Sequence, residues 1–131
     1  MPFVAYDVSI QLIEQLAVVV AQLEERDADL ADQMRRAATS VSLNLGEGAG
    51  CSAGRRRVHY EIAHGSAREV KACLDVAVAW GWARDYTQPR AVLDRLLGLL
   101  WGLTKGKWIK TRKGVPIRES GPRGDRASDR A

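Results

Sequence analysis

Apolar residues recur at steps of three and four along most of this 131-residue chain, and no other feature of the sequence constrains the fold as strongly. That period places apolar side chains on one face of an α-helix. It predicts four helices, over about residues 6–25, 29–46, 55–81 and 89–104. The side chains that we expect in the core are Val8, Leu12, Leu16, Val19, Val20, Leu23, Leu30, Met34, Ala37, Ala38, Val41, Leu45, Val58, Ile62, Val70, Leu74, Ala77, Val78, Val92, Leu93, Leu96, Leu97, Leu99, Leu100 and Leu103.

Residues that are favoured at the ends of helices mark where these helices begin and end. Asp27 or Asp29 can cap the second helix, because a carboxylate there accepts hydrogen bonds from unpaired backbone amides. The glycines in 46–50 predict its end, since glycine adopts the left-handed conformation that terminates helices. Gly81 predicts the end of the third helix in the same way, and Pro89 is tolerated in the first turn of the fourth.

The connections between the four helices are short, which favours neighbours that pack antiparallel. Before Gly114 no run of alternating apolar and polar residues is bounded by turns, so the chain has no material for a sheet. We therefore predict an all-α fold, an antiparallel up-down-up-down four-helix bundle over residues 1–107. Residues 108–131 carry glycine, proline and charge with few apolar side chains, which predicts a disordered basic tail. The broad apolar arc of the fourth helix indicates either oligomerisation or a wide core.

Two further features bear on the environment of the protein. No apolar run approaches the roughly 20 residues needed to cross a bilayer, and the first residues lack the pattern of a secretory signal. We expect no membrane contact and a cytoplasmic location. Cys51 and Cys73 are too far apart for a CxxC site, so we interpret both as free thiols.

Positive charge is concentrated in the tail and at the start of the third helix. Residues 105–131 hold nine of the 20 lysines and arginines but three of the 16 acidic residues, which favours a polyanionic partner such as RNA, DNA or an acidic protein surface. A solvated loop and a Trp108 that packs on the bundle are the alternatives. Phosphate contacts and base stacking would use Arg55, Arg56, Arg57, Lys105, Lys107, Trp108, Lys110, Arg112 and Lys113.

The sequence offers little for catalysis. Glu61 and His64 form a Glu-x-x-His pair, but a di-iron site needs a second such pair, and His59 has Arg56 three residues before it. Phosphate-binding and dinucleotide-binding loops are missing from the sequence. We therefore predict a protein that is not an enzyme, with no catalytic residue, no cofactor and no metal.

Two segments carry a family resemblance. Residues 33–48 read QMRRAATSVSLNLGEG, residues 62–69 read IAHGSARE, and AWGW follows at 79–82. This pattern resembles the four-helix bundle family of 23S ribosomal RNA intervening-sequence proteins over roughly residues 6–104. The matching positions that we expect to be structural are Arg36, Asn44, Glu47, Gly48, Gly65 and Glu69. Among them, we expect Asn44 and Glu47 to bond backbone groups at the glycine-rich turn or to pair with Arg36, and Gly65 with Ser66 to allow close helix contact.

The resemblance also implies an assembly and partners. It implies a bacterial protein that forms a ring, commonly a homopentamer, without known catalysis. The related accessory variability protein of diversity-generating retroelements is similar to it in fold and binds nucleic acid and a reverse transcriptase. The leading hypothesis is accordingly a non-enzymatic, ring-forming accessory protein that binds nucleic acid or a nucleic-acid enzyme through its basic segments. The alternative hypothesis is an oligomeric protein–protein adaptor that does not bind nucleic acid.

Overall fold

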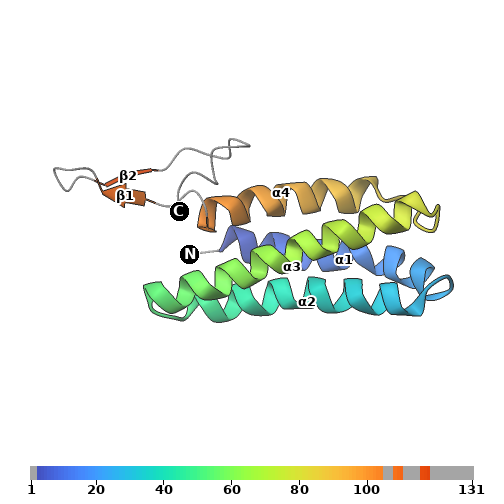
Figure 1. The fold of residues 1–131 in the computed structure, drawn as a ribbon, viewed down its shortest axis with the longest axis horizontal. Helices are drawn as coiled ribbons and strands as arrows, with labels where there is room; N and C mark the ends of the chain where they lie inside the picture. The colour runs from blue at the N-terminus through green and yellow to red at the C-terminus, as the bar shows by residue number, and fades with distance from the viewer. Residues whose placement is uncertain (1–2, 105–107, 111–115, 119–131) are drawn as a thin grey trace.

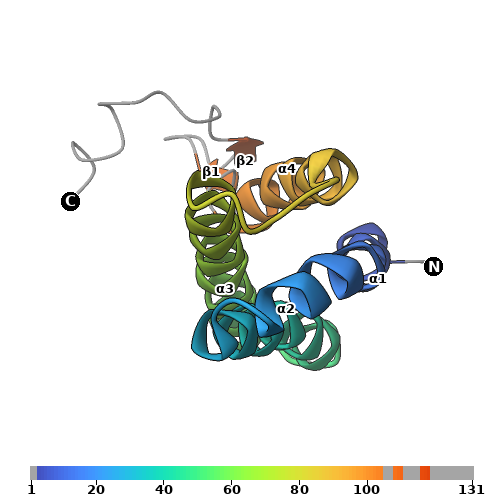
Figure 2. The same ribbon diagram turned by 90° about the vertical axis from the view of Figure 1, so that its right-hand side faces the viewer.

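Four α-helices make up nearly all of the part of the chain that the structure describes (Figure 1). The computed structural model describes residues 3–104, 108–110 and 116–118. The helices are α1 (Val4–Glu24), α2 (Ala28–Ala49), α3 (Ala53–Ala79) and α4 (Thr87–Thr104). Each packs against two others: α1 against α2 and α4, and α3 against α2 and α4. Figure 1 shows consecutive helices lying side by side and running in opposite directions, and Figure 2 shows the same bundle nearly end on. The prediction of an all-α four-helix protein is confirmed.

The core is built from aliphatic side chains that all four helices contribute. Leu12, Leu45, Leu74 and Leu96 are completely buried, as are Met34, Val41, Val70, Leu93 and Leu100. Burying a side chain of this size stabilises the fold by roughly 1.5–3 kcal/mol, so these rows are the main source of stability.

The predicted orientation of the first half of α3 is wrong. Val58 and Ile62, which we expected in the core, have 54% and 46% of their surface exposed. Tyr60, Ala63 and Ala67 are buried in their place. The two sets lie on opposite sides of the helix because residues two apart are rotated by about 200°.

The ends of the helices follow the predicted signals only in part. Asp27 caps α2, since its Oδ1 accepts a hydrogen bond from the Leu30 amide at 3.0 Å. Gly81 adopts a left-handed conformation with φ of 76° just after α3, as predicted. Helix α2 ends at Ala49 with Gly50 as its C-cap, within the predicted range of 46–50, but Gly50 has a φ of −92°, so the expected left-handed conformation is wrong there.

Hydroxyl pairs and a close glycine contact join α2 to its neighbours. The hydroxyl of Ser9 donates to the Tyr6 carbonyl at 2.6 Å, so the buried Ser42 hydroxyl donates to Ser9 at 2.8 Å. A Cβ atom placed on Gly48 would lie 2.8 Å from the Tyr60 ring, so α3 approaches α2 there at a distance that only glycine allows.

Helix α1 is long and apolar enough to cross a bilayer by length and composition, contrary to our expectation for any segment of this chain. Core helices of soluble bundles share these properties, and the buried face of α1 is filled by α2 and α4. In this structure, α1 therefore contributes to the core of the bundle.

Two three-residue strands follow the bundle. Strand β1 (Trp108–Lys110) pairs antiparallel with β2 (Pro116–Arg118), with Ile109 opposite Ile117. We predicted no strand in this region, although aromatic and β-branched residues such as these favour strands. The rest of the predicted tail, residues 111–115 and 119–131, lies outside the described residues.

Candidate nucleic-acid interface

Three consecutive arginines, Arg55, Arg56 and Arg57, are the third to fifth residues of α3, and the structure exposes all of them. Arg56 donates from Nη2 to the Cys51 carbonyl at 3.0 Å, and Arg57 Nε lies 3.8 Å from Glu61 Oε2. Arg55 forms no ion pair with any residue that the structure describes. The positive charge of Arg55 and Arg56 is therefore not matched by a carboxylate in the folded bundle.

The backbone at this helix start also favours an anion. Ser52 is the N-cap residue, but its side chain makes no capping hydrogen bond, and the first turn contains no acidic residue. Unpaired amides and the positive end of the helix dipole point out of this turn. Amides and guanidinium groups together form an environment that attracts phosphate.

Polar side chains of α2 and α3 form a cluster close to the arginines in sequence, made of Asn44 and Glu47 on α2 and His59 on α3. Asn44 donates from Nδ2 to the Ser40 carbonyl at 2.9 Å, which leaves its Oδ1 facing His59 Nδ1 at 3.0 Å. Glu47 Oε2 lies 4.0 Å from the same ring nitrogen. Asn44 therefore joins α2 to α3 through His59, a contact that we did not predict.

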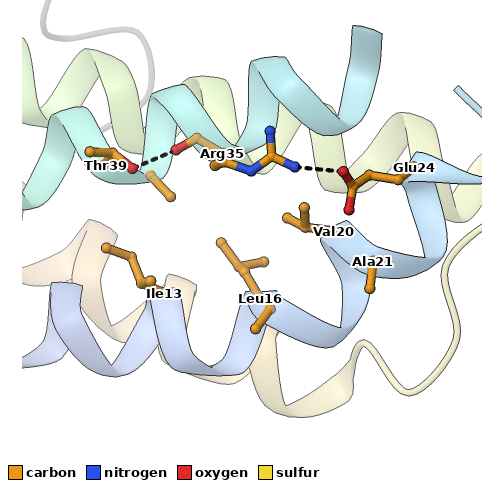
Figure 3. A pocket seen from close by; sticks show the side chains of 9 residues that line it. Ile13, Leu16, Val20, Ala21, Glu24, Arg35 and Thr39 are labelled. Atoms are coloured by element: carbon orange, nitrogen blue, oxygen red, sulfur yellow. Dashed lines mark hydrogen bonds and ion pairs between the residues drawn. The ribbon is translucent and has the colours of Figure 1, made fainter. Parts of the chain in front are cut away.

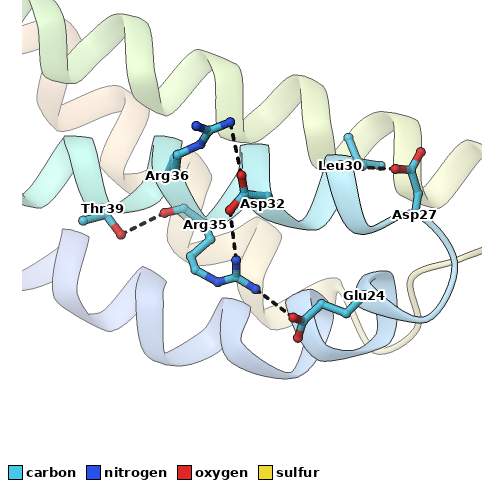
Figure 4. Close-up of polar contacts among 7 residues, drawn as sticks. All are labelled: Glu24, Asp27, Leu30, Asp32, Arg35, Arg36 and Thr39. Carbon is cyan, nitrogen blue, oxygen red and sulfur yellow. Dashed lines mark hydrogen bonds and ion pairs between the residues drawn. The ribbon is translucent and has the colours of Figure 1, made fainter.

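Arg36 does not take part in this cluster. Its Nη2 pairs with Asp32 at 3.2 Å, one turn earlier on α2 (Figure 4). Of the two alternatives that we expected, pairing of Arg36 with Asn44 or Glu47 is wrong, because eight and eleven residues separate them, about 12 and 16 Å along the helix axis. Asn44 instead bonds a backbone group, the Ser40 carbonyl within α2 rather than one at the glycine-rich turn.

Gly65 and Glu69, two other positions of the family pattern, differ in whether they contact α2. Gly65 is exposed, and a Cβ atom built on it would have no atom within 4 Å, so the expectation of close helix contact at this glycine is wrong. Its neighbour Ser66 does face α2, where its hydroxyl lies 2.9 Å from that of Ser40. Glu69 accepts a hydrogen bond from Gln33 of α2 at 3.2 Å.

The second predicted basic segment begins where α4 ends. Thr104 lies beside α3, with its hydroxyl 3.3 Å from His64 Nδ1, about 10 Å along α3 from Arg57. Figure 1 shows α4 ending at the same end of the bundle at which α3 begins. Trp108 and Lys110 belong to β1. Four further predicted residues lie outside the described residues: Lys105, Lys107, Arg112 and Lys113.

A groove between α1 and α2 is mainly apolar, unlike the basic start of α3. It has a volume of about 300 Å³ and is lined mainly by apolar side chains, among them Ile13, Leu16 and Val20 (Figure 3). Arg35 closes one end, where it pairs with Glu24 at 3.1 Å and Asp32 at 3.2 Å (Figure 4). Because two carboxylates already match this guanidinium, the groove suits an apolar partner better than a phosphate.

An apolar stripe runs along the outer face of α3, and we did not predict it. Val58 and Ile62 begin the stripe, Val76 continues it, and Trp80, with 67% of its surface exposed, ends it. Residues spaced by four and by eighteen share a helix face, as Val58 does with Ile62 and with Val76, so the spacing could have revealed this second apolar face.

Groups that bind metals do not gather in the described part of the chain. Among those residues, no three His, Cys, Asp or Glu side chains converge on a point that could hold an ion. Glu61 pairs with Arg57, and His64 faces Thr104 of α4. The Glu-x-x-His pair is thus engaged in contacts with other side chains.

Comparison with known proteins gives one family. The family model described as 23S rRNA-intervening sequence protein matches residues 3–99, which is more than half of the chain. No curated protein matches the chain. The match includes the arginines of α3, the polar cluster and both apolar surfaces, and it ends within α4.

Proposed function

The chain belongs to the 23S rRNA-intervening sequence protein family, and on that premise we propose that it is a non-enzymatic accessory protein that binds nucleic acid. The arginines at residues 55–57 carry the proposal, because they are exposed beside one another at an uncapped helix start with no acidic residue in its first turn. Guanidinium groups bind phosphates through paired hydrogen bonds, and such contacts supply most of the sequence-independent affinity for nucleic acid. A nucleic-acid enzyme, such as a reverse transcriptase, is the protein partner that fits the same role.

Self-association is the second element of the proposal. The protein carries two different unpartnered apolar surfaces, the stripe on α3 and the groove between α1 and α2. If the stripe of one copy packs into the groove of the next, the contact joins unlike surfaces, and contacts of this kind generate a closed ring where the rotation between neighbours closes. A homopentamer is the ring that the family resemblance implies. It would repeat the arginine cluster in every subunit, so weak single contacts would add through avidity.

The binding element is tested by fluorescence anisotropy with labelled RNA and DNA oligonucleotides at 50 and 200 mM salt, values of the order at which phosphate contacts are sensitive to salt. Binding should weaken steeply with salt, and replacing the three arginines at 55–57 with alanine should lower both the affinity and the salt dependence. The Arg36→Ala variant is the matched control, because it removes an exposed arginine elsewhere on the bundle. A chain cut after Thr104 separates the contribution of the C-terminal residues. Absence of binding to either nucleic acid at low salt would rule the proposal out.

The assembly element is tested by multi-angle light scattering of the purified protein and of the Val58→Asp and Ile62→Asp variants. Both side chains are about half exposed, so aspartate should leave the helical circular dichroism unchanged while it lowers the molar mass. Thr39→Asp places the same charge in the groove between α1 and α2 and should have the same effect. A monomeric wild-type protein at micromolar concentration would contradict the ring.

The alternative function is an oligomeric adaptor for proteins. The apolar groove favours it, because a groove lined mainly by apolar side chains suits the apolar face of a helix from another protein. An assembled ring that binds neither RNA nor DNA would favour the adaptor over the nucleic-acid binder.

A further inference from the structure

We propose that His59 forms, together with Arg55, a single phosphodiester-binding site in which the protonated imidazole donates from Nε2. The inference rests on the proposed function, because it names a further binding residue within the same interface. It also gives that interface a dependence on pH that the arginines cannot provide.

Asn44 determines which nitrogen of His59 carries the proton in the neutral ring. The Ser40 carbonyl can only accept a hydrogen bond, so the Asn44 atom that faces it at 2.9 Å must be the Nδ2 donor. The other amide atom of Asn44, the Oδ1 acceptor, therefore faces His59 Nδ1 at 3.0 Å. Nδ1 must carry the proton in that contact, which leaves Nε2 with a lone pair in the neutral ring and with a second proton in the imidazolium form.

Nε2 is available for a ligand. The His59 side chain is 24% exposed, and every contact that the structure gives its ring is made by Nδ1. In the described part of the chain, Nε2 of His59 has no hydrogen-bond partner. Among the described residues, the buried side-chain polar atom without a partner is Nε1 of Trp101, so Nε2 of His59 is not buried and reaches solvent. A phosphate oxygen can approach this nitrogen without displacing a protein contact.

The position of His59 places it beside the arginines. It follows Arg55 by four residues and Arg56 by three, and both spacings bring side chains together on a helix surface, with Cβ atoms about 5–6 Å apart. One phosphodiester is wide enough to accept hydrogen bonds from Arg55 and Nε2 at the same time. Arg56 is held toward the Cys51 carbonyl and adds its charge from the side.

The charges around the ring come from both packed elements. Glu47 on α2 lies 4.0 Å from Nδ1, and Arg55 and Arg56 precede His59 on α3. Tyr60, the next residue on α3, is buried, and burial raises the pKa of its phenol, so it remains neutral below pH 8. Cys51 lies at the turn between the two helices. Imidazole changes its charge between pH 5 and 8, so a bound phosphodiester should be held more tightly as the pH falls through this range.

The test measures binding of a fluorescent oligothymidylate at pH 5.5 and pH 8.0, because its phosphodiesters keep one negative charge throughout. The wild-type protein should bind about fivefold more tightly at pH 5.5, the effect of one added charge-assisted hydrogen bond at a partly exposed site. His59→Gln removes the titrating ring but keeps an amide donor for Asn44, and its affinity should be nearly equal at the two pH values. His64→Gln, which removes the second of the two histidines, should retain the fivefold response.

A spectroscopic measurement separates a ligand contact from a structural effect. The Cε1 proton signal of His59, identified by its loss in His59→Gln, should shift when the oligonucleotide is added at pH 5.5, and the signal of His64 should not. If His59→Gln binds with the same pH response as the wild type, or if the His59 signal is unaffected by saturating oligonucleotide, the site is wrong while nucleic-acid binding stands. If the wild type does not bind at either pH, the proposed function itself fails.

Discussion

Replacing Gly48 with alanine should destabilise the bundle, whereas replacing Gly98 with alanine should stabilise it. Both glycines lie within helices, and alanine is favoured over glycine in a helix by about 1 kcal/mol. The two sites differ in the space around them. A Cβ atom on Gly98 would meet no atom within 4 Å, whereas one on Gly48 would lie 2.8 Å from the Tyr60 ring and 3.0 Å from His59 Cβ.

The sign at Gly48 depends on whether these neighbours can move. Carbon atoms pack best at about 3.5–4.0 Å, so each contact is too short by roughly half an ångström or more. The Tyr60 ring is buried and packs against Phe3 with ring centroids 5.7 Å apart, and His59 Cβ is fixed to the α3 backbone. Overpacking of this kind costs about 1–3 kcal/mol. After the gain in helix preference, we expect Gly48→Ala to lose about 1–2 kcal/mol and Gly98→Ala to gain up to about 1 kcal/mol.

Urea unfolding followed by circular dichroism at 222 nm measures both free energies, at one fixed protein concentration because self-association would add to the apparent stability. In thermal melts, the two variants should differ by roughly 5–10 °C. If Gly48→Ala proves as stable as Gly98→Ala, then α2 and α3 are not in close contact at this position, and the placement of His59 against α2 would have to be revised.

Two other predictions concern titrating groups. Hydrogen bonds from Lys71 and from Arg90 hold the pKa of Asp75 below its ordinary value, so Asp75→Asn should reduce the free energy of unfolding by less than about 1 kcal/mol above pH 5, since the carboxylate is partly exposed and screened. This difference should shrink as the pH falls below about 4, because the unfolded chain takes up a proton there while the folded carboxylate stays ionised until its lowered pKa is reached, and urea titrations at pH 7 and pH 3 would detect the change. Burial raises the pKa of the Cys73 thiol, so a thiol reagent should modify Cys51 in the folded protein and reach Cys73 only on unfolding; equal rates for the two would contradict the buried position.

The helices could be predicted from the sequence wherever bulky aliphatic residues repeat in a single phase. Val41, Leu74 and Leu100 are completely buried, as their spacing predicts. The prediction failed in the first half of α3, where the inward positions are held largely by alanine and the large apolar residues, Val58 and Ile62, face outward. Alanine gives little hydrophobic signal, so the larger residues determined the predicted phase, and the wrong face was assigned to the core.

The candidate site could be predicted in position but not in detail. Consecutive arginines at a helix start are visible in the sequence and indicate phosphate binding without any knowledge of packing. The contact of Asn44 with His59 depends on how far α2 and α3 are rotated about their axes, which spacing within one helix does not determine. Glycines have a similar ambiguity, because Gly48 permits close packing inside a helix whereas Gly81 ends one.

The hydroxyl pair between Ser9 and Ser42 selects one alignment of α1 against α2. Leucine and valine rows tolerate sliding, since one apolar residue replaces another after a shift of one turn, about 5.4 Å. Such a shift would break the hydrogen bond between the Ser9 and Ser42 hydroxyls, which contributes about 0.5–1.5 kcal/mol. This polar contact between α1 and α2 thus penalises slipped and domain-exchanged pairings of the first two helices, which aliphatic packing alone would accept.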